Sequence, residues 1–126
     1  MSLNLPLRPR RLRRTAALRR LVRETRLAAD DLIYPLFVHD GAENVDVSSM
    51  PGVVRHSADS LVKECEAAFA AGVPAVAIFP SVEASLKDEQ GSYGLVAENL
   101  LYRAIRRIKS ELPDLAIVTD VALDPY

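Results

Sequence analysis

The stretch LIYPLFV at residues 32–38 is an almost continuous apolar run, which predicts a β-strand buried on both faces, as in a parallel sheet. Pro35 within this run removes one hydrogen bond from the strand ladder. Two later runs are of the same kind, AVAIF at residues 75–79 and LAIVTDVAL at residues 115–123. The sequence therefore predicts three buried strands separated by longer segments.

Helical periodicity occupies both gaps between these strands. Residues 57–71 form the first predicted helix, with Ser57 as its N-cap and Gly72 just past its end. The second predicted helix spans residues 95–112 and ends before Pro113. The positions expected on the buried faces are Leu61, Cys65, Ala68 and Phe69 in the first helix and Leu101, Ala104, Ile105, Ile108 and Leu112 in the second.

Alternating strands and helices predict an α/β fold with a parallel sheet and right-handed crossovers. Both a doubly wound sheet and the opening of an eight-stranded barrel fit this order. No helix follows the third strand, so we expect a fold that is incomplete after it. Residues 39–56, with the turn signal Met50-Pro51-Gly52, and the polar residues 80–94 are predicted to be loops.

The N-terminal part differs in charge from the rest of the chain. Residues 1–26 hold nine arginines and one acid, a net charge of +8, whereas the remaining residues carry −9. Pro6 and Pro9 predict an extended arm over residues 1–14, and a short helix capped by Thr15 follows up to residue 27. Its apolar face is expected to contain Leu18, Leu21 and Val22. We divide the chain into this arm, residues 1–27, and an α/β part, residues 28–126. The basic arm suggests a strap docked on a neighbouring subunit, or a phosphate-binding tail.

Composition excludes several classes of protein. No apolar run reaches the roughly 20 residues that cross a bilayer, and the start lacks the apolar stretch of a signal peptide. Cys65 is the only cysteine, so this chain forms no internal disulfide and no cysteine metal cluster, and we expect it in the core. No aromatic residues interleave the arginines, which disfavours nucleic acid as a partner. We expect a cytoplasmic location. The second possibility is that the basic N-terminus is an organelle transit peptide.

Asp120 and Asp124 are the candidate site residues. Asp120 is expected in the carboxyl-terminal half of the third strand, where α/β folds assemble their active sites. In an extended strand both carboxylates would face the same side, about 13 Å apart. Such a pair can hold a hard cation or orient an ammonium group. The alternative is structural, with Asp120 in a salt bridge and Asp124 capping a turn, and the pattern alone favours it.

Other polar residues carry weaker signals. His39 and His56 fall in predicted loops without the HExxH spacing of a zinc site, so we expect them to be solvated and assign them no role. The loop at residues 87–92 lacks the glycine spacing of a phosphate cradle, which counts against nucleotide binding.

Six segments resemble the porphobilinogen synthase (5-aminolevulinate dehydratase) family in the family's own order. They are RPRRLRR at residues 8–14, DLIYPLFV at 31–38, SMPGV at 49–53, IF at 78–79, KDEQGS at 87–92 and TDVALDPY at 119–126. The resemblance implies a (β/α)₈ TIM barrel, of which this chain supplies the N-terminal arm and the first three strands. It also implies a homo-octamer in which the arm embraces a neighbouring subunit.

The resemblance further implies the reaction and its residues. The family condenses two 5-aminolevulinate molecules to porphobilinogen in haem and other tetrapyrrole synthesis, using two lysines on later strands as Schiff-base nucleophiles. Lys63, Lys87 and Lys109 do not correspond to those lysines, so residues 1–126 alone are expected to be inactive. Asp120 matches the family's active-site aspartate, beside the substrate amino group or the metal. Residues 87–92 match the active-site lid region.

The metal expected from this resemblance is magnesium. Zinc-dependent members carry cysteines at the positions of Ala122 and Asp124, which here are replaced by residues without sulfur. Aspartate oxygens suit a hard cation, so Asp124 is the candidate metal ligand, and no organic cofactor is expected. Two alternatives stay open: a different Schiff-base barrel such as an aldolase, which TDVALDPY argues against, and a non-catalytic module that binds an acidic partner through its arginines.

Overall fold

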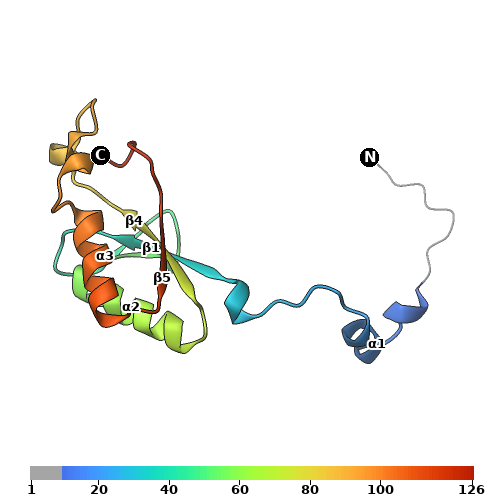
Figure 1. Ribbon diagram of the computed structural model, residues 1–126. Coiled ribbons are helices and arrows are strands. Elements are labelled where there is room, and N and C mark those ends of the chain that lie inside the picture. The colour runs from blue at the N-terminus through green and yellow to red at the C-terminus, as the bar shows by residue number, and fades with distance from the viewer. Residues whose placement is uncertain (1–9) are drawn as a thin grey trace, which may run out of the picture.

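The computed structural model describes residues 10–126, which form a five-stranded sheet with two helices packed on one of its faces (Figure 1). The predicted extended conformation of residues 1–14, with Pro6 and Pro9, lies mostly outside the described residues. The strand order is β2-β3-β1-β4-β5.

The three strands predicted from the apolar runs lie side by side and parallel in this sheet. β1 (Ile33–Val38) pairs with β4 (Ala75–Pro80) along its full length, Pro35 included, and β4 pairs with β5 (Ala116–Thr119). The third strand is shorter than predicted, because the chain leaves the sheet after Thr119. It then turns, and the backbone N–H of Tyr126 donates to the carbonyl of Leu123 at 3.0 Å.

The predicted loop at residues 39–56 is wrong in part, because it contains a small hairpin. β2 (Val45–Asp46) and β3 (Val54–His56) are antiparallel, and β3 pairs with β1 in parallel at Phe37 and Val38. The turn between them closes with a hydrogen bond from the Val53 N–H to the Met50 carbonyl at 3.0 Å. Gly52 adopts a φ of 82° there, a conformation that favours glycine.

The two helices between the parallel strands are confirmed, with one boundary corrected. α2 (Ala58–Ala70) begins after Ser57, whose side chain accepts from the Ser60 N–H. α3 (Leu100–Glu111) begins five residues later than predicted, after the N-cap Asn99. The preceding residues instead form two short 3-10 turns, η3 (Ala84–Leu86) and η4 (Ser92–Leu95), so the predicted loop is not wholly irregular.

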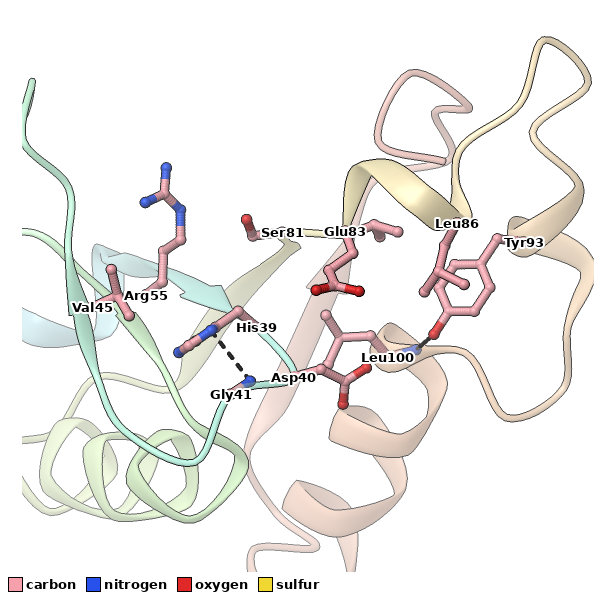
Figure 2. Close-up of a pocket in the computed structure, with 11 residues that line it drawn as sticks. His39, Asp40, Gly41, Val45, Arg55, Ser81, Glu83, Leu86, Tyr93 and Leu100 are labelled. Carbon is pink, nitrogen blue, oxygen red and sulfur yellow. Dashed lines mark hydrogen bonds between the residues drawn. The ribbon is translucent and has the colours of Figure 1, made fainter.

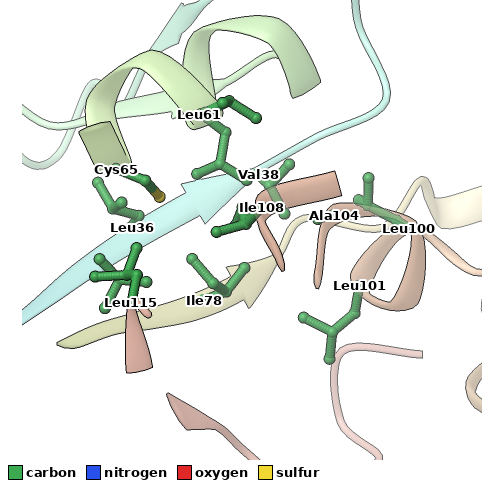
Figure 3. Packing of buried hydrophobic residues seen from close by; sticks show 12 residues of the cluster. Leu36, Val38, Leu61, Cys65, Ile78, Leu100, Leu101, Ala104, Ile108 and Leu115 are labelled. Atoms are coloured by element: carbon green, nitrogen blue, oxygen red, sulfur yellow. The ribbon is translucent and has the colours of Figure 1, made fainter. Parts of the chain in front are cut away.

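The core lies between the helices and one face of the sheet (Figure 3). Leu36, Val38, Val76 and Ile78 of the strands meet the helical side chains Leu61, Val62, Cys65, Leu100, Leu101, Ala104 and Ile108. Phe69 was predicted to be buried and is exposed instead, with Val62 in the core. The opposite face of the sheet is open: Phe37 and Phe79 pack against each other on it, and Val118 is 44% exposed. The expectation of strands buried on both faces is therefore wrong for this part of the molecule.

This arrangement favours a barrel over a doubly wound sheet. β1, β4 and β5 are neighbours in chain order, and α2 and α3 lie on the same side of them. A doubly wound sheet reverses its strand order and carries helices on both faces. Within residues 10–126 both helices lie on one face, and the three strands that they connect, β1, β4 and β5, continue in one direction.

The arm runs away from the sheet (Figure 1). Its described residues contain a 3-10 turn, η1 (Arg11–Arg13), and the helix α1 (Ala16–Leu21), and a further turn, η2 (Ala29–Asp31), leads from the arm into β1. Thr15 caps α1 as predicted, accepting from the Leu18 N–H at 3.1 Å, but the helix ends at Leu21 rather than at residue 27. Within residues 10–126 its predicted apolar face is largely open, since Leu21 and Val22 are 79% and 42% exposed. No helix among the described residues is long and apolar enough to span a membrane.

Candidate active site

Asp120 and Asp124 lie together at the carboxyl edge of the parallel strands. Both line a cavity of about 210 Å³, here called the aspartate cavity. Its other walls come from the end of β4, from α3 and from the C-terminal turn, through Ile78, Phe79, Pro80, Leu101, Ala122, Pro125 and Tyr126. The structure thus brings the two candidate residues into one hollow, at the edge where barrel enzymes place their chemistry.

The two aspartates do not lie on one extended strand, as the sequence analysis expected. Asp120 is the first residue after β5, one position beyond Thr119, rather than inside the strand. Asp124 lies in the turn that follows, so the spacing of an extended strand does not apply. Both carboxylates are exposed, and within residues 10–126 neither has an ion-pair partner. The salt bridge of the structural alternative is therefore not formed inside the described part of the chain.

The loop between β4 and α3 is ordered by its own side chains. The Asp88 carboxylate accepts from the backbone N–H groups of Gln90 and Ser92, at 3.0 and 2.9 Å. These hydrogen bonds favour the ionised form and lower the pKa of Asp88. Gly91 follows in the left-handed region with a φ of 63°. A Cβ at Gly91 would lie 3.5 Å from the Cβ of Leu123, so the loop packs on the segment that carries the two aspartates.

A second and larger cavity, about 530 Å³, opens beside the first at the ends of β1 and β4 (Figure 2). His39, Asp40, Arg55, Glu83 and Tyr93 supply its polar lining. The Nδ1 atom of His39 accepts from the Gly41 N–H at 3.3 Å, so its Nε2–H is placed to donate to the Glu43 carbonyl at 2.8 Å. His39 is half-buried and orders its own loop, rather than being simply solvated.

Arginines of α3 tie this edge of the sheet to the helices. Arg103 donates to both carboxylate oxygens of Asp40, at 2.5 and 2.7 Å, and this contact raises the pKa of the Arg103 guanidinium. Arg107 pairs with Asp59 of α2. Both arginine side chains are half-exposed.

His56 and Cys65 lie away from the cavities that contain the aspartates. His56 ends β3, is only 6% exposed, and contacts the Ser60 Oγ through Nδ1 at 3.1 Å. The expectation of a solvated His56 is therefore wrong, and burial lowers the pKa of its imidazole. Cys65 is fully buried in the core as predicted, and burial raises the pKa of its thiol to about 11.

The metal-binding capacity of this region is limited to the two carboxylates. No group of three or more His, Cys, Asp or Glu side chains comes together within residues 10–126. Two carboxylates in one cavity match the way proteins hold magnesium, which keeps several water ligands and needs only one or two acidic side chains. A sulfur-rich zinc site does not fit, because the single thiol is buried in the core.

A parallel sheet in barrel order, with helices on one face and two aspartates at its carboxyl edge, is typical of the opening part of a (β/α)₈ barrel. The family model for delta-aminolevulinic acid dehydratase matches residues 6–126. The chain belongs to the delta-aminolevulinic acid dehydratase family, whose enzymes are also named porphobilinogen synthases.

Individual relatives agree with this assignment. The chain is 46% identical to the delta-aminolevulinic acid dehydratases of Bradyrhizobium diazoefficiens and Chlamydia pneumoniae, with 99% of the chain covered in each case. It is 42% identical to a chloroplastic enzyme of Arabidopsis thaliana, over 98% of the chain. A crystal structure of the Toxoplasma gondii enzyme, in complex with the product porphobilinogen, superposes with a TM-score of 0.91 at 42% identity. That likeness covers 99% of this chain and 36% of the Toxoplasma chain, and it confirms the barrel class.

The chain spans between a third and two fifths of the length of the first two relatives, 36% and 38%. The family resemblance read from the six sequence segments is thereby confirmed. The roles of Asp120 and Asp124 stay predictions, because the comparisons concern the family and the fold.

The sequence did not reveal the uncharged residues that determine the shape of the cavities. Asn99 is one of these, and its signal was present, since asparagine before an apolar helical run is a common N-cap. Tyr93 and Tyr126 are the others. No sequence pattern links them, because they meet only through the tertiary fold.

Proposed function

We propose that the longer protein containing this chain is a porphobilinogen synthase, which condenses two 5-aminolevulinate molecules to porphobilinogen with loss of water, a lyase step of tetrapyrrole and haem synthesis. The observation that carries the proposal is the aspartate cavity, because the motif TDVALDPY forms its wall at the carboxyl edge of a barrel sheet. The family relationship over nearly the whole chain supports the same reaction.

Asp120 is the catalytic residue of this proposal. Its carboxylate lies at the end of β5 beside Phe79 and Tyr126, where an anionic group next to apolar walls suits a substrate ammonium. Water exclusion by the later strands of the barrel would strengthen this attraction, because Coulomb interactions grow as the local dielectric falls. Asp120 would then fix the orientation of the amino group for the condensation.

We expect Asp120→Asn in the full-length protein to lower kcat/KM on the order of 10²-fold, the size typical of losing one preorganised electrostatic contact. Steady-state assays of porphobilinogen formation measure this change. Asp114→Asn is the matched control, because Asp114 is also an exposed aspartate but lies at the amino end of β5. Equal activity of the two variants would contradict the assignment of Asp120.

Magnesium is the metal we propose, with Asp124 as the ligand that this chain contributes. The carboxylate oxygens fit a hard cation, and water or later parts of the protein would complete the shell. When bound, the ion would supply positive charge near the substrate. Asp124→Ala should raise the magnesium concentration that gives half-maximal activity, and an unchanged magnesium dependence would show that Asp124 is not a ligand.

The Schiff-base lysines belong, in this proposal, to later strands. Lys63 lies on α2, Lys87 ends η3, and Lys109 donates to the carbonyls of Pro113 and Leu115 at 3.1 and 2.6 Å. None of the three lines the aspartate cavity. Because the condensation needs these amines, residues 1–126 alone should form no porphobilinogen.

Borohydride reduction in the presence of 5-aminolevulinate tests this assignment. The full-length protein should gain covalently attached substrate, seen by mass spectrometry on lysines outside this chain. The isolated chain should gain none under the same conditions. Labelling of Lys63, Lys87 or Lys109 would overturn the assignment.

The arm is the part we propose to dock on another copy of the protein, in an octamer. Its support is the apolar surface left open on and after α1, where Leu21 and Leu27 are 79% and 81% exposed, and the excess of arginine around it. Removing residues 1–27 from the full-length protein should reduce the oligomer size in sedimentation experiments. Binding of the arm to polyanions, lost at high salt, would instead support the interaction-module alternative.

The cytoplasm is the location we propose. The relatives from Bradyrhizobium and Chlamydia are bacterial enzymes, whereas several plant relatives are chloroplastic. A fluorescent fusion of the full-length protein in its source cell tests this point, and signal confined to an organelle would contradict it.

The aldolase alternative has no support from the family match.

A further inference from the structure

We propose that Tyr93 and Tyr126 form an aromatic clasp that positions the segment carrying Asp120 and Asp124, and that Tyr93 is a positioning residue for the reaction. This inference rests on the proposed function and adds a residue to its site. In this clasp the Tyr126 ring packs on the Tyr93 ring and on the backbone of Gly94.

The segment after β5 has few anchors of its own. β5 ends at Thr119, so residues 120–126 make no sheet hydrogen bonds. Their one internal backbone hydrogen bond, from Tyr126 to Leu123, closes the final turn. Val121 and Leu123 are largely exposed. The placement of Asp120 and Asp124 therefore depends on what the segment packs against.

The loop before α3 supplies that support. The rings of Tyr93 and Tyr126 lie with centroids 6.2 Å apart at 50°, within the range of favourable tilted aromatic pairs. Gly94 allows the ring of Tyr126 to approach the backbone, since an added Cβ would lie 3.2 Å from Cδ2 and 3.4 Å from Cγ. The approach of Gly91 to Leu123 continues the same contact along the loop.

The clasp is itself fixed to the core. The Tyr93 hydroxyl accepts from the Leu100 N–H at 3.2 Å, at the start of α3 (Figure 2). Asn99, fully buried, donates from Nδ2 to the Gly94 carbonyl at 3.2 Å and accepts from the Tyr102 N–H at 2.9 Å. Leu100 belongs to the core cluster. A continuous set of contacts thus runs from the core through α3 to Tyr126.

Each ring also forms part of the wall of a cavity. Tyr93 lines the larger cavity and Tyr126 lines the aspartate cavity. Burial raises the pKa of the Tyr126 phenol, so this wall stays uncharged at neutral pH. A displaced ring would change the shape of the aspartate cavity and the position of its carboxylates together.

Small displacements matter because catalysis depends on placement to within about 1 Å, and a 1 Å error can cost about 10²-fold in rate. Gly94→Ala is the cleanest probe, since the three atoms nearest to its methyl group would all belong to the Tyr126 ring, and alanine tolerates the negative φ at this position. In the full-length protein, Gly94→Ala and Tyr93→Leu should lower kcat/KM by about 10-fold or more. Tyr93→Phe, which keeps the ring but loses the hydroxyl that accepts from the Leu100 N–H, should be impaired less than Tyr93→Leu.

Tyr34→Leu is the matched control. Tyr34 has a hydroxyl hydrogen bond to Glu64 at 3.0 Å and is similarly half-exposed, but it faces α2 and lies outside both cavities. Its loss should leave kcat/KM unchanged. In a Tyr126→Ala background, Gly94→Ala should have no further effect, because alanine lacks the Cγ and Cδ2 atoms that the added methyl group would meet.

Hydrogen exchange supplies a readout that does not depend on activity. Amides of residues 120–126 should exchange faster in Tyr93→Leu and Gly94→Ala than in the wild type or in Tyr34→Leu. Unchanged kcat/KM and exchange in Gly94→Ala would overturn the clasp, as would a Tyr93→Phe variant as impaired as Tyr93→Leu. If Tyr93→Leu fails to fold, Gly94→Ala decides the question alone. A wild-type protein that forms no porphobilinogen would refute the proposed function, while the exchange comparison would still decide on the clasp.

Discussion

Hydrogen bonds from single polar side chains fasten the loops of this chain to its helices. Asn44 donates to the Ser60 Oγ at 2.8 Å and accepts from the Ser57 N–H at 3.1 Å, and His56 contacts the same Ser60 hydroxyl. These contacts hold the β1–β2 loop against the start of α2. Of these residues only His56 is an ionisable group, and it is almost fully buried.

Stability should therefore fall in mild acid. Burial lowers the pKa of His56 below its ordinary value near 6.5, so the unfolded chain binds this proton more readily than the folded one. The stabilisation is complete above about pH 6.5 and decreases as the pH falls below that value. Urea unfolding at pH 7.5 and 5.5 should show a smaller pH effect in His56→Gln than in the wild type. An identical pH effect in both would contradict this account.

Helix α3 depends on the cap that its sequence provides. Asn99 both accepts from the first turn of α3 and donates to the loop at Gly94, with no exposed surface. Asn99→Ala should lower the free energy of unfolding by about 1–2 kcal/mol, because it removes the cap and leaves the Gly94 carbonyl without its donor. Asn99→Ser, which keeps a capping oxygen, should lose less. Equal losses for the two variants in denaturant unfolding would show that the cap is not the cause.

The same elements show what sequence patterns can and cannot predict. The central strands and both helices follow from apolar runs and helical periodicity, because burial against one core imposes these repeats. The start of α3 was placed too early because Leu95 has an apolar side chain, although it is 86% exposed in a 3-10 turn. The end of β5 was placed too late, since Val121 continues the apolar pattern after the strand has ended. β2 and β3 have two and three residues, too few for a period to appear.

The candidate site likewise contains residues that the sequence predicts and contacts that it does not. Asp120 and Asp124 were found by residue type and by family resemblance, and the fold does bring them to one cavity. The contacts that place them, from Tyr93, Gly94 and Asn99, join distant parts of the chain and leave no local repeat. Only a structure could reveal them.

At the scale of the molecule, one face of the sheet has no cover from the described part of the chain, residues 10–126. Ile33 is 56% exposed and Phe79 is 37% exposed on that face, and Val118 extends the same apolar surface. In the relatives' barrel class such a face points into the barrel. Isolated residues 1–126 should therefore self-associate and bind an apolar dye, which sedimentation velocity and dye fluorescence measure. Phe79→Lys should weaken both effects, and a monomeric wild-type chain that binds no dye would contradict the expectation.

The position of the core along the chain has a consequence for synthesis on the ribosome. All its members lie between Leu36 and Leu115, so every partner is present before any later strand has been translated. In a protein of the relatives' length, this layer of helices on strands can form while the rest is still being made, because N-terminal parts fold first during translation. The open sheet face would then serve as the surface on which the later strands assemble, and until they arrive it is the part of the nascent protein most in need of a chaperone.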